Sequence, residues 1–292
     1  MLLLDGKKVR SEIAERLRER IAKFSSSPVL AIIQAGGREE SNAYIARKKA
    51  FGESIGAKVL HIRLPESVSE DELIERIKAL NIDANVHGII LQLPLPEGYS
   101  KQRIIDRILP EKDVDGLTFA QSARRAKGEK EAMTPATARG IVLLLEFYNI
   151  SISGKKVAVL GRSALVGAPT AEALSSAGAK VTVCHSKTVN TKEITRASDV
   201  IVVAIGKPKL IGREYFREDK TQTVIDVGIT AVRGSGITRL QEEIPSRQLA
   251  GDVDFEAVKD MVAAISPVPG GVGPMTVAAL FENVVEAFEK QM

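Results

Sequence analysis

The chain has 292 residues, of which 44% are hydrophobic and 27% are charged, a balance typical of folded globular proteins. These values exclude a disordered chain, a collagen-like repeat and a disulfide scaffold, and the length indicates about two domains. Lys and Arg outnumber Asp and Glu by only 41 to 37, a net charge of +4 that does not indicate a nucleic-acid-binding protein.

The few cysteines and histidines argue against disulfides and metal sites. The single cysteine, Cys184, excludes an intrachain disulfide and a zinc site built on paired thiolates. The three histidines lie far apart in the sequence without ligand spacing, so we expect no metal. Met1–Lys7 becomes charged too early for a signal peptide, and no stretch approaches the roughly 20 apolar residues of a membrane helix. We therefore expect a cytoplasmic protein without membrane segments.

The first part of the chain alternates short apolar runs with helical patterns. Strands are predicted at Val29–Gln34, Lys58–Leu64 and Val86–Leu93. Helices are predicted up to Ile55, with Ser41 as the N-cap, and over Ser69–Leu80. This alternation predicts a parallel sheet with helices on its faces.

The second part restarts the alternation after a helix predicted at Ala138–Tyr148 and ends with a helix at Thr276–Gln291. Its apolar runs predict parallel strands that are covered on both faces. They lie at Lys155–Leu160, Ala179–Cys184, Asp199–Ile205 and Gln222–Val227. We expect the boundary between the two parts to lie between Asp115 and Pro135.

A glycine-containing turn, Gly161–Gly167, follows one predicted strand and opens a helix. Small residues there allow close approach of a phosphate to the backbone and to N–H groups at the helix N-terminus. The turn departs from the G-x-G-x-x-G pattern, because Ser163 replaces the second glycine and Gly167 comes one place late. An ordinary strand–helix turn is therefore the alternative.

The end of the next strand bears on the choice of dinucleotide. NAD-binding units tend to place a carboxylate there for the ribose 2′-hydroxyl, and the run from Cys184 to Thr188 contains none. Ser186 and Thr188 can donate hydrogen bonds to a 2′-phosphate, and Arg162 can neutralise it. The pattern favours NADP over NAD, with an ordinary polar turn as the alternative.

The densest cluster of proline and glycine is the loop Ser266–Thr276. Glycines let the backbone lie flat against a ligand, and prolines stiffen the loop that presents it. Because ligands of open α/β sheets bind beyond the carboxyl ends of the strands, this loop could contact both cofactor and substrate. A rigid connector is the alternative.

Polar residues in the first part form a second candidate site. Tyr44 and Lys48 are four residues apart and share one helix face, where the amine can transfer a proton if its pKa is lowered; a surface pair is the alternative. Gln92 lies in an apolar strand, so its buried amide could orient a substrate or water, or cap a loop. Asp113 or Asp115 could hold a nitrogen-rich ring, or both could belong to a solvated acidic turn.

Taken together, these segments resemble the bifunctional methylenetetrahydrofolate dehydrogenase/cyclohydrolase family over nearly the whole chain. The resemblance depends on nine segments in the family's order. They are Ser41–Lys48, Gln92–Pro96, Lys112–Gly116, Thr134–Pro135, Gly161–Ser163 with Val166, Gly167 and Pro169, His185–Thr188, Asp226–Ile229, Gly251–Phe255 and Pro267–Thr276.

The resemblance implies an α/β protein of two α/β domains with a cleft between them, the second a Rossmann-type parallel sheet. Residues 1–117 would bind folate, with the helix at about 276–292 packing back on them, and residues 136–275 would bind NADP. The implied enzyme oxidises 5,10-methylenetetrahydrofolate with NADP and hydrolyses the methenyl product to 10-formyltetrahydrofolate. It would act in one-carbon metabolism and purine biosynthesis, as a homodimer without a metal.

The resemblance also implies roles for individual residues. Lys48 would be the key residue of hydrolysis, with Gln92 supporting it and a water as nucleophile. Tyr44 would stack or hydrogen-bond along the folate, and Asp115 would hold the pterin ring. The other implied folate contacts are Leu91, Leu93, Pro269, Gly270, Gly271, Val272 and Gly273. The implied NADP contacts are Gly161, Arg162, Ser163, Val166, Gly167, His185, Ser186, Thr188, Gly206 and Ile229.

The chain departs from the family between its two parts. The family often has Pro-Cys-Thr-Pro where this chain has Glu131-Ala132-Met133-Thr134-Pro135, and a glycine is usual near Thr137. Two alternatives stay open: another two-domain NADP dehydrogenase of a small acid such as shikimate, and a non-catalytic NADP-binding sensor.

Overall fold

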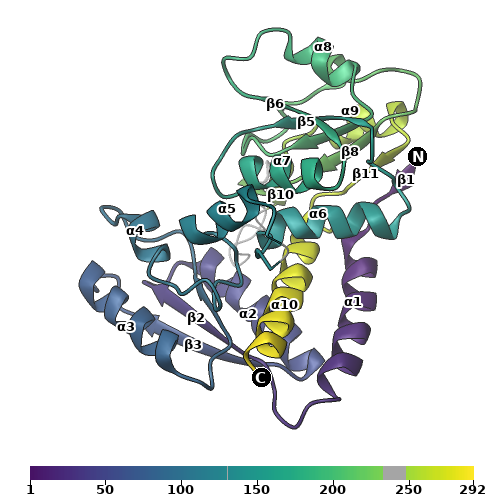
Figure 1. The fold of residues 1–292 in the computed structure, drawn as a ribbon. Helices are drawn as coiled ribbons and strands as arrows, with labels where there is room; N and C mark the ends of the chain where they lie inside the picture. Colours follow the sequence, from purple (N-terminus) through teal and green to yellow (C-terminus); the bar gives the residue numbers. More distant parts are fainter. Residues whose placement is uncertain (130, 233–247) are drawn as a thin grey trace, which may run out of the picture. The chain divides into compact units, whose positions relative to one another are not determined.

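The computed structural model describes residues 1–129, 131–232 and 248–292, which form two compact units. The first, here called the six-stranded unit, comprises Met1–Val9 and Thr137–Met275. The second, the three-stranded unit, comprises Arg10–Ala136 and Thr276–Met292. Figure 1 draws the chain as a ribbon and labels most of its helices and strands.

The three-stranded unit is built on a small parallel sheet in the order β3-β2-β4. Its strands are β2 (Val29–Ala35), β3 (Lys58–Leu64) and β4 (Gly88–Leu91). All of β4 and most of β2 are buried, because apolar side chains lie on both faces of these strands. Asp113 bridges to Ile89 and extends the sheet beyond β4.

Helices pack around this sheet and complete the unit (Figure 1). They are α2 (Glu39–Ile55), α3 (Glu70–Ile82), α4 (Lys101–Ile105), α5 (Phe119–Ala126) and most of α1 (Gly6–Ile21) and α10 (Val272–Gln291). Ser69 forms a capping box with Glu72 at the start of α3. Helices α1 and α10 are joined by ion pairs of Arg16 with Glu282 and of Arg20 with Glu289.

The predicted start of α2 is wrong. The helix begins at Glu39, two residues before Ser41, and its N-cap is Arg38, which makes no side-chain capping bond. Ser41 is 4% exposed and lies inside the first turn. A glutamate is favourable at this position because of the positive end of the helix dipole, which explains the earlier start. The helix ends at Gly56, whose φ of 85° suits a left-handed C-cap.

The six-stranded unit is a parallel sheet in the order β1-β11-β8-β7-β5-β6. Its strands are β1 (Leu2–Leu3), β5 (Lys156–Leu160), β6 (Lys180–Cys184), β7 (Val200–Val203), β8 (Thr223–Asp226) and β11 (Ala264–Ile265). Its helices are α6 (Ala136–Phe147, from Thr137 on), α7 (Gly167–Ser176), α8 (Thr191–Arg196), α9 (Phe255–Val258) and the 3₁₀ turns η1 (Arg213–Tyr215) and η2 (Lys259–Met261). An antiparallel pair, β9 (Thr230–Val232) with β10 (Gln248–Ala250), stands apart from the sheet.

The predicted α/β class with a Rossmann-type parallel sheet is confirmed. Strands β5, β7 and β8 are buried nearly throughout, as predicted for covered parallel strands. The prediction is wrong for β6, where Val183 is 38% exposed, because β6 is the edge of the sheet. The chain forms β6 on one side of β5 and then crosses to β7 on the other side. This reversal makes the carboxyl ends of β5 and β7 the expected ligand crevice.

Candidate active site

In the three-stranded unit, a lysine and an amide meet beyond the carboxyl end of β4. The Nζ atom of Lys48, on α2, donates a hydrogen bond of 3.0 Å to Oε1 of Gln92. Gln92 follows β4 directly and is only 8% exposed, and its Nε2 donates to the carbonyl of Leu93 at 2.8 Å. The amide is thereby fixed in one orientation, with its oxygen toward Lys48.

Asp115 is the acidic residue beside Lys48, and the structure separates its role from that of Asp113. Asp113 is 1% exposed, and its carboxylate accepts backbone N–H groups of Thr118 at 2.9 Å and Leu117 at 3.3 Å. Asp115 is half-buried and interacts electrostatically with Lys48. Of the two acidic residues left open by the sequence, Asp113 therefore holds the loop through backbone amides, and Asp115 is the one beside Lys48.

The surroundings change the proton affinity of both charged groups. Burial lowers the pKa of the Lys48 ammonium, and the Asp115 carboxylate partly opposes this shift. Burial raises the pKa of Asp115, an effect that Lys48 reduces and Asp113 reinforces. Both pKa values are thus shifted in the direction of neutral pH, as expected of residues that exchange protons with a substrate.

The other predicted residues of this site lie near it but contribute differently. Tyr44 is half-buried one helical turn before Lys48, and the Arg47 guanidinium lies 5.5 Å from the centre of its ring. The side chain of Leu91 belongs to the buried core, and Leu93 packs partly against the same core. A folate contact of Leu91 would therefore have to use its backbone.

A network of polar side chains next to the start of α2 was not predicted from the sequence. His61 Nε2 and Gln34 Oε1 are 2.8 Å apart, and Gln34 Nε2 donates to Asn42 Oδ1 at 2.9 Å. Gln34 is 1% exposed and lies in β2. A polar residue in an apolar strand was the available signal, the same one that singled out Gln92.

In the six-stranded unit, two glycines shape the turn after β5. Gly161 has a φ of +117°, and a Cβ atom there would lie 2.1 Å from the carbonyl oxygen of Ala204. A Cβ on Gly167 would lie 2.3 Å from the carbonyl oxygen of Gly161. Larger residues at either position would push the turn away from the strand and helix, which explains the two glycines.

Some backbone N–H groups at the start of α7, which could otherwise bind a phosphate, already donate hydrogen bonds within the protein. Gly167 N–H donates to the Ser163 hydroxyl at 3.2 Å, Ala168 N–H donates to the Ser163 carbonyl at 3.0 Å, and Pro169 has no N–H. The amides of Gly167 and Ala168 are therefore already bonded within the protein. The exposed side chains of Arg162 and Ser163 remain as phosphate-binding groups at this turn.

The turn after β6 is held by its own side chains. His185 N–H donates to Thr188 Oγ1 at 2.9 Å, and Thr188 N–H donates back to the His185 carbonyl at 2.8 Å. Ser186 between them is exposed. The turn thus presents hydroxyl groups and no carboxylate at the end of β6.

The remaining predicted cofactor residues follow β7 and β8. Gly206 has a φ of +73°, and a Cβ there would meet nothing within 4 Å. Ile229 is 40% exposed, and its Cδ1 would lie 3.4 Å from a Cβ on Gly273. The start of α10, including Val272 and Gly273, therefore borders Ile229 within this unit. In the rest of the loop, Gly270 accepts the N–H of Gly6 at 2.9 Å.

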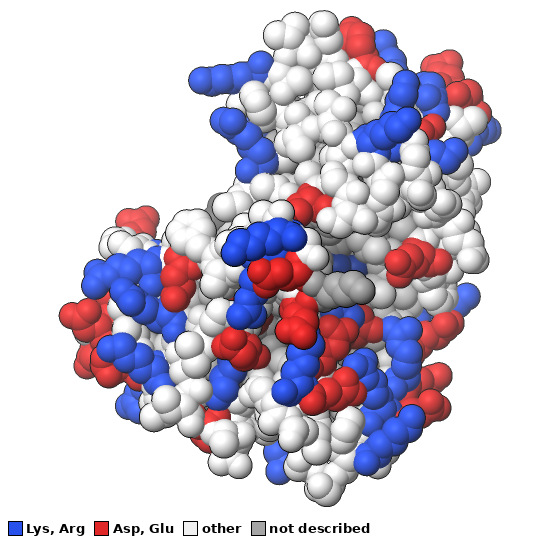
Figure 2. Space-filling view, in the orientation of Figure 1, with Lys and Arg blue, Asp and Glu red and all other residues white. Residues whose placement is uncertain are grey.

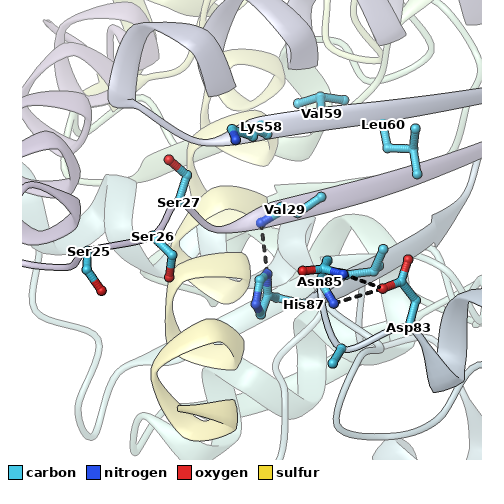
Figure 3. Close-up of a pocket in the computed structure, with 12 residues that line it drawn as sticks. Ser25, Ser26, Ser27, Val29, Lys58, Val59, Leu60, Asp83, Asn85 and His87 are labelled. Carbon is cyan, nitrogen blue, oxygen red and sulfur yellow. Dashed lines mark hydrogen bonds between the residues drawn. The ribbon is translucent and has the colours of Figure 1, made fainter.

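The structure also shows a hollow of about 740 Å³ on the three-stranded unit, drawn in Figure 3. Ser25, Ser26, Ser27, Lys58, Asp83 and His87 are among its lining residues. It lies at the amino ends of the strands, where Val29 N–H donates to His87 Nδ1 at 3.1 Å. Because Gln92 lies past the carboxyl end of β4, this hollow is not where the predicted site residues meet.

In the described residues, no three or more His, Cys, Asp or Glu side chains lie close enough to ligate one metal ion. Likewise, no described helix is long and apolar enough to cross a membrane.

On the face shown in Figure 2, Lys and Arg side chains are interspersed with Asp and Glu. The charges on this face therefore form no large surface of a single sign.

Comparison with known protein families covers both units. A model described as the catalytic domain of tetrahydrofolate dehydrogenase/cyclohydrolase matches residues 4–115, and one described as the NAD(P)-binding domain of the same family matches residues 135–292. The chain belongs to the tetrahydrofolate dehydrogenase/cyclohydrolase family. The Lys48–Gln92–Asp115 group lies in the part matched by the catalytic domain.

Relatives of this family resemble the chain along its length. It is 45% identical to the bifunctional protein FolD of Prochlorococcus marinus, covering 98% of this chain and 94% of the relative. It is 40% identical to the cytoplasmic C-1-tetrahydrofolate synthase of Schizosaccharomyces pombe, of which it spans only 30%.

Solved structures give the same family. The bifunctional FolD enzyme of Campylobacter jejuni has a TM-score of 0.92 at 37% identity and full coverage of both chains. The Trypanosoma brucei enzyme, solved with NADP cofactor and inhibitor, has a TM-score of 0.91 at 34% identity, covering 99% of this chain and 98% of that one. Shikimate dehydrogenase of Thermus thermophilus has a TM-score of 0.53 at 16% identity, which shows a shared fold alone.

Proposed function

We propose that this protein is a bifunctional enzyme of one-carbon metabolism. It oxidises 5,10-methylenetetrahydrofolate to the methenyl form with NADP, and it hydrolyses the methenyl form to 10-formyltetrahydrofolate. The observation that carries the proposal is the hydrogen bond of 3.0 Å between Lys48 and Gln92, with Asp115 beside them, in the part of the chain matched by the family's catalytic domain.

The hydrolytic step needs a group that moves a proton. Water adds to the methenyl carbon, and the bond from this carbon to one folate nitrogen breaks. One of the two water protons passes to that nitrogen, and the other is released as the C=O of the formyl group forms. Burial lowers the pKa of Lys48, so its amine exchanges protons more readily than a solvated lysine. Gln92 keeps the amine in place because its amide oxygen accepts a hydrogen bond from Nζ.

The same unit offers groups that bind the folate ring. The pterin presents adjacent N–H groups, which a carboxylate receives through paired hydrogen bonds. We assign this role to Asp115, because the carboxylate of Asp113 is already bonded to backbone amides. Tyr44 lies one turn from Lys48, so its ring and hydroxyl are available along the folate.

The six-stranded unit fits NADP. The Gly161 turn leaves room for close backbone approach, Arg162 and Ser163 offer a cation and a hydroxyl, and Ser186 lies on a turn without carboxylates. NADP accepts a hydride from the folate when it is bound, and the protein contributes orientation. We assign folate binding to residues 1–117 with the helix at 276–292, and NADP binding to residues 136–275.

We further propose that the enzyme works in the cytoplasm as a homodimer and supplies 10-formyltetrahydrofolate for purine biosynthesis. The name of the S. pombe relative supports the compartment. The exposed β6 edge, where Val183 is 38% exposed, and the turn after it, where Val189 is 77% exposed, support a second copy at the six-stranded unit. Light scattering should then give twice the chain mass of 31.5 kDa, and the mass of a single chain would contradict the dimer.

One assay tests the activity and its alternatives. Purified protein is mixed with 5,10-methylenetetrahydrofolate and NADP, and NADPH and methenyl absorbance are followed together. We expect NADPH to form while the methenyl compound stays low because it is hydrolysed. A failure to form NADPH would contradict the dehydrogenase, and accumulation of unhydrolysed methenyl compound above its uncatalysed hydrolysis would contradict the cyclohydrolase. NADPH formation from shikimate instead would favour the small-acid dehydrogenase, and NADP binding without turnover would favour the sensor.

A further inference from the structure

Asp252 is a buried carboxylate bonded to the chain just past β7. It is 0% exposed, and its Oδ2 accepts N–H groups of Ile205 at 2.6 Å and Gly206 at 2.8 Å. Its Oδ1 has no hydrogen-bond partner among the described residues. Burying a carboxylate with one oxygen unpaired is costly, so a position that keeps one is expected to serve a purpose besides stability.

Asp226, the last residue of β8, holds the neighbouring segments in the same manner. Its Oδ1 accepts N–H groups of Gly228 at 2.9 Å and Asp252 at 3.0 Å, and its Oδ2 accepts the N–H of Val253 at 2.9 Å. Burial, reinforced by the charge of Asp252, raises the pKa of Asp226 to about 6. The two carboxylates thus act on each other and on the segments that follow β7 and β8.

The packing around the two carboxylates depends on glycines. A Cβ on Gly228 would lie 2.4 Å from Asp252 Oδ1, and a Cβ on Gly251 would lie 2.0 Å from Asp226 Oδ2. On the other side, Ala204 abuts Gly161, as described above. The carboxylates are therefore part of one continuous set of contacts that reaches the glycine turn after β5.

The strand order indicates which half of a bound dinucleotide would lie here. A dinucleotide binds across the carboxyl ends of the sheet, with one half on each side of the point where the order reverses. Strands β5 and β6, with Arg162 and Ser186, form the side that would receive the adenosine half and its 2′-phosphate. Ile205–Gly206 and Gly228–Ile229 follow β7 and β8, so they belong to the nicotinamide side.

We propose that Asp252 is a positioning residue of the dehydrogenase, which together with Asp226 holds Ile205–Gly206 and Gly228–Ile229 in the arrangement that receives the nicotinamide half of NADP. The inference rests on the proposed NADP-dependent function. Asp252 itself acts through the backbone amides that it binds.

Three variants test this role. Asp252→Ala removes the acceptor of both amides. Asp252→Asn keeps a side-chain oxygen that can accept the N–H groups of Ile205 and Gly206. Its amide nitrogen replaces Oδ1, which accepts no hydrogen bond from any described residue, so this change removes none of those bonds. Asp199→Ala is the matched control, because Asp199 precedes β7 and its Oδ2 accepts the N–H of Lys156 at 2.9 Å at the opposite end of the same strand. For each variant, the NADP dissociation constant, the KM for NADP and the rate of methenyl hydrolysis are measured.

We expect Asp252→Ala to raise the dissociation constant and the KM for NADP by about tenfold or more, since the two backbone amides that it holds lose their charged acceptor. Methenyl hydrolysis should stay within about twofold, Asp252→Asn should restore most of the NADP affinity, and Asp199→Ala should leave it unchanged. The proposal is overturned if Asp252→Ala binds NADP with wild-type affinity, or if its methenyl hydrolysis falls by the same factor as its NADP affinity. It is also overturned if Asp252→Asn loses as much NADP affinity as Asp252→Ala, or if Asp199→Ala does. If the wild-type protein binds NADP but forms no NADPH, the proposed function fails while the binding measurements still test Asp252.

Discussion

The surroundings of Lys48 change the pKa of its side chain and fix its position. A solvated lysine is a poor proton carrier at neutral pH because its amine holds its proton too tightly. At Lys48, burial favours the neutral amine, while Asp115 and the Gln92 oxygen favour the ammonium. The net result is a lowered pKa in a fixed position, which is what a residue that passes a proton to and from a substrate requires.

Arg162 is the residue expected to select NADP. Its guanidinium is exposed beside the Gly161 turn, where it can bind a 2′-phosphate, and a charge-assisted hydrogen bond of this kind contributes roughly 1.5–3 kcal/mol. We therefore expect Arg162→Ala to raise the KM for NADP by about 10- to 100-fold and the KM for NAD much less.

The control for this prediction is Arg213→Ala, which removes another exposed arginine of the same unit. It should leave both KM values unchanged. Equal weakening of NADP and NAD by Arg162→Ala would show that Arg162 does not read the 2′-phosphate.

At the residue scale, sequence reasoning could find the chemistry but not the partners. Tyr44 and Lys48 could be placed on one face from their spacing, whereas the Lys48–Gln92 bond joins residues 44 positions apart and needs the folded chain. The choice between Asp113 and Asp115 likewise depends on the amides of Leu117 and Thr118. Asp252 received no role because its partners lie 46 and 47 residues away in the sequence.

At the scale of elements, the ends of the strands carry most of the polar residues discussed above. Asp226 closes β8, and its raised pKa makes the stability of the fold depend on pH. Between about pH 4 and 6 the native state holds a proton on Asp226 that the unfolded chain has released, so stability falls as pH rises through this window and levels off above it. The shift from 3.8 to about 6 corresponds to about 3 kcal/mol.

Asp226→Asn tests this effect, because an amide does not titrate. We expect the wild-type protein to lose about 3 kcal/mol more stability between pH 4 and 7 than the variant does, as measured by urea unfolding at both pH values. The variant also loses a hydrogen bond to the backbone, so only the difference in pH dependence is diagnostic. Parallel pH dependences in the two proteins would contradict the assignment.

The long apolar strands were easier to predict than the helix ends and the edge elements. The boundaries of β3 were predicted correctly and those of β5 within one residue, because a run of Val, Ile and Leu between polar residues defines them. Helix α5 and the two-residue strands β1 and β11 were not predicted, since so few residues carry little pattern. The exposure of β6 could not be foreseen because strand order is a property of the whole sheet.

At the scale of the whole molecule, we propose that the two activities depend on different units. Lys48, the proposed proton-transfer residue, lies in the three-stranded unit, and the residues proposed to bind NADP lie in the six-stranded unit. A change at Lys48 should therefore affect hydrolysis of the methenyl compound without affecting NADP binding. Lys49→Met provides a matched control, because Lys49 points about 100° away around the same helix.

The most direct measurement is the rate of methenyltetrahydrofolate hydrolysis by Lys48→Met, taken together with the dissociation constant for NADP in the same preparation. We expect Lys48→Met to lose hydrolysis by about 100-fold or more, with NADP affinity within about twofold of the wild-type value, while Lys49→Met keeps both. Hydrolysis at the wild-type rate by Lys48→Met, or an equal loss of NADP affinity, would contradict the proposed role of Lys48.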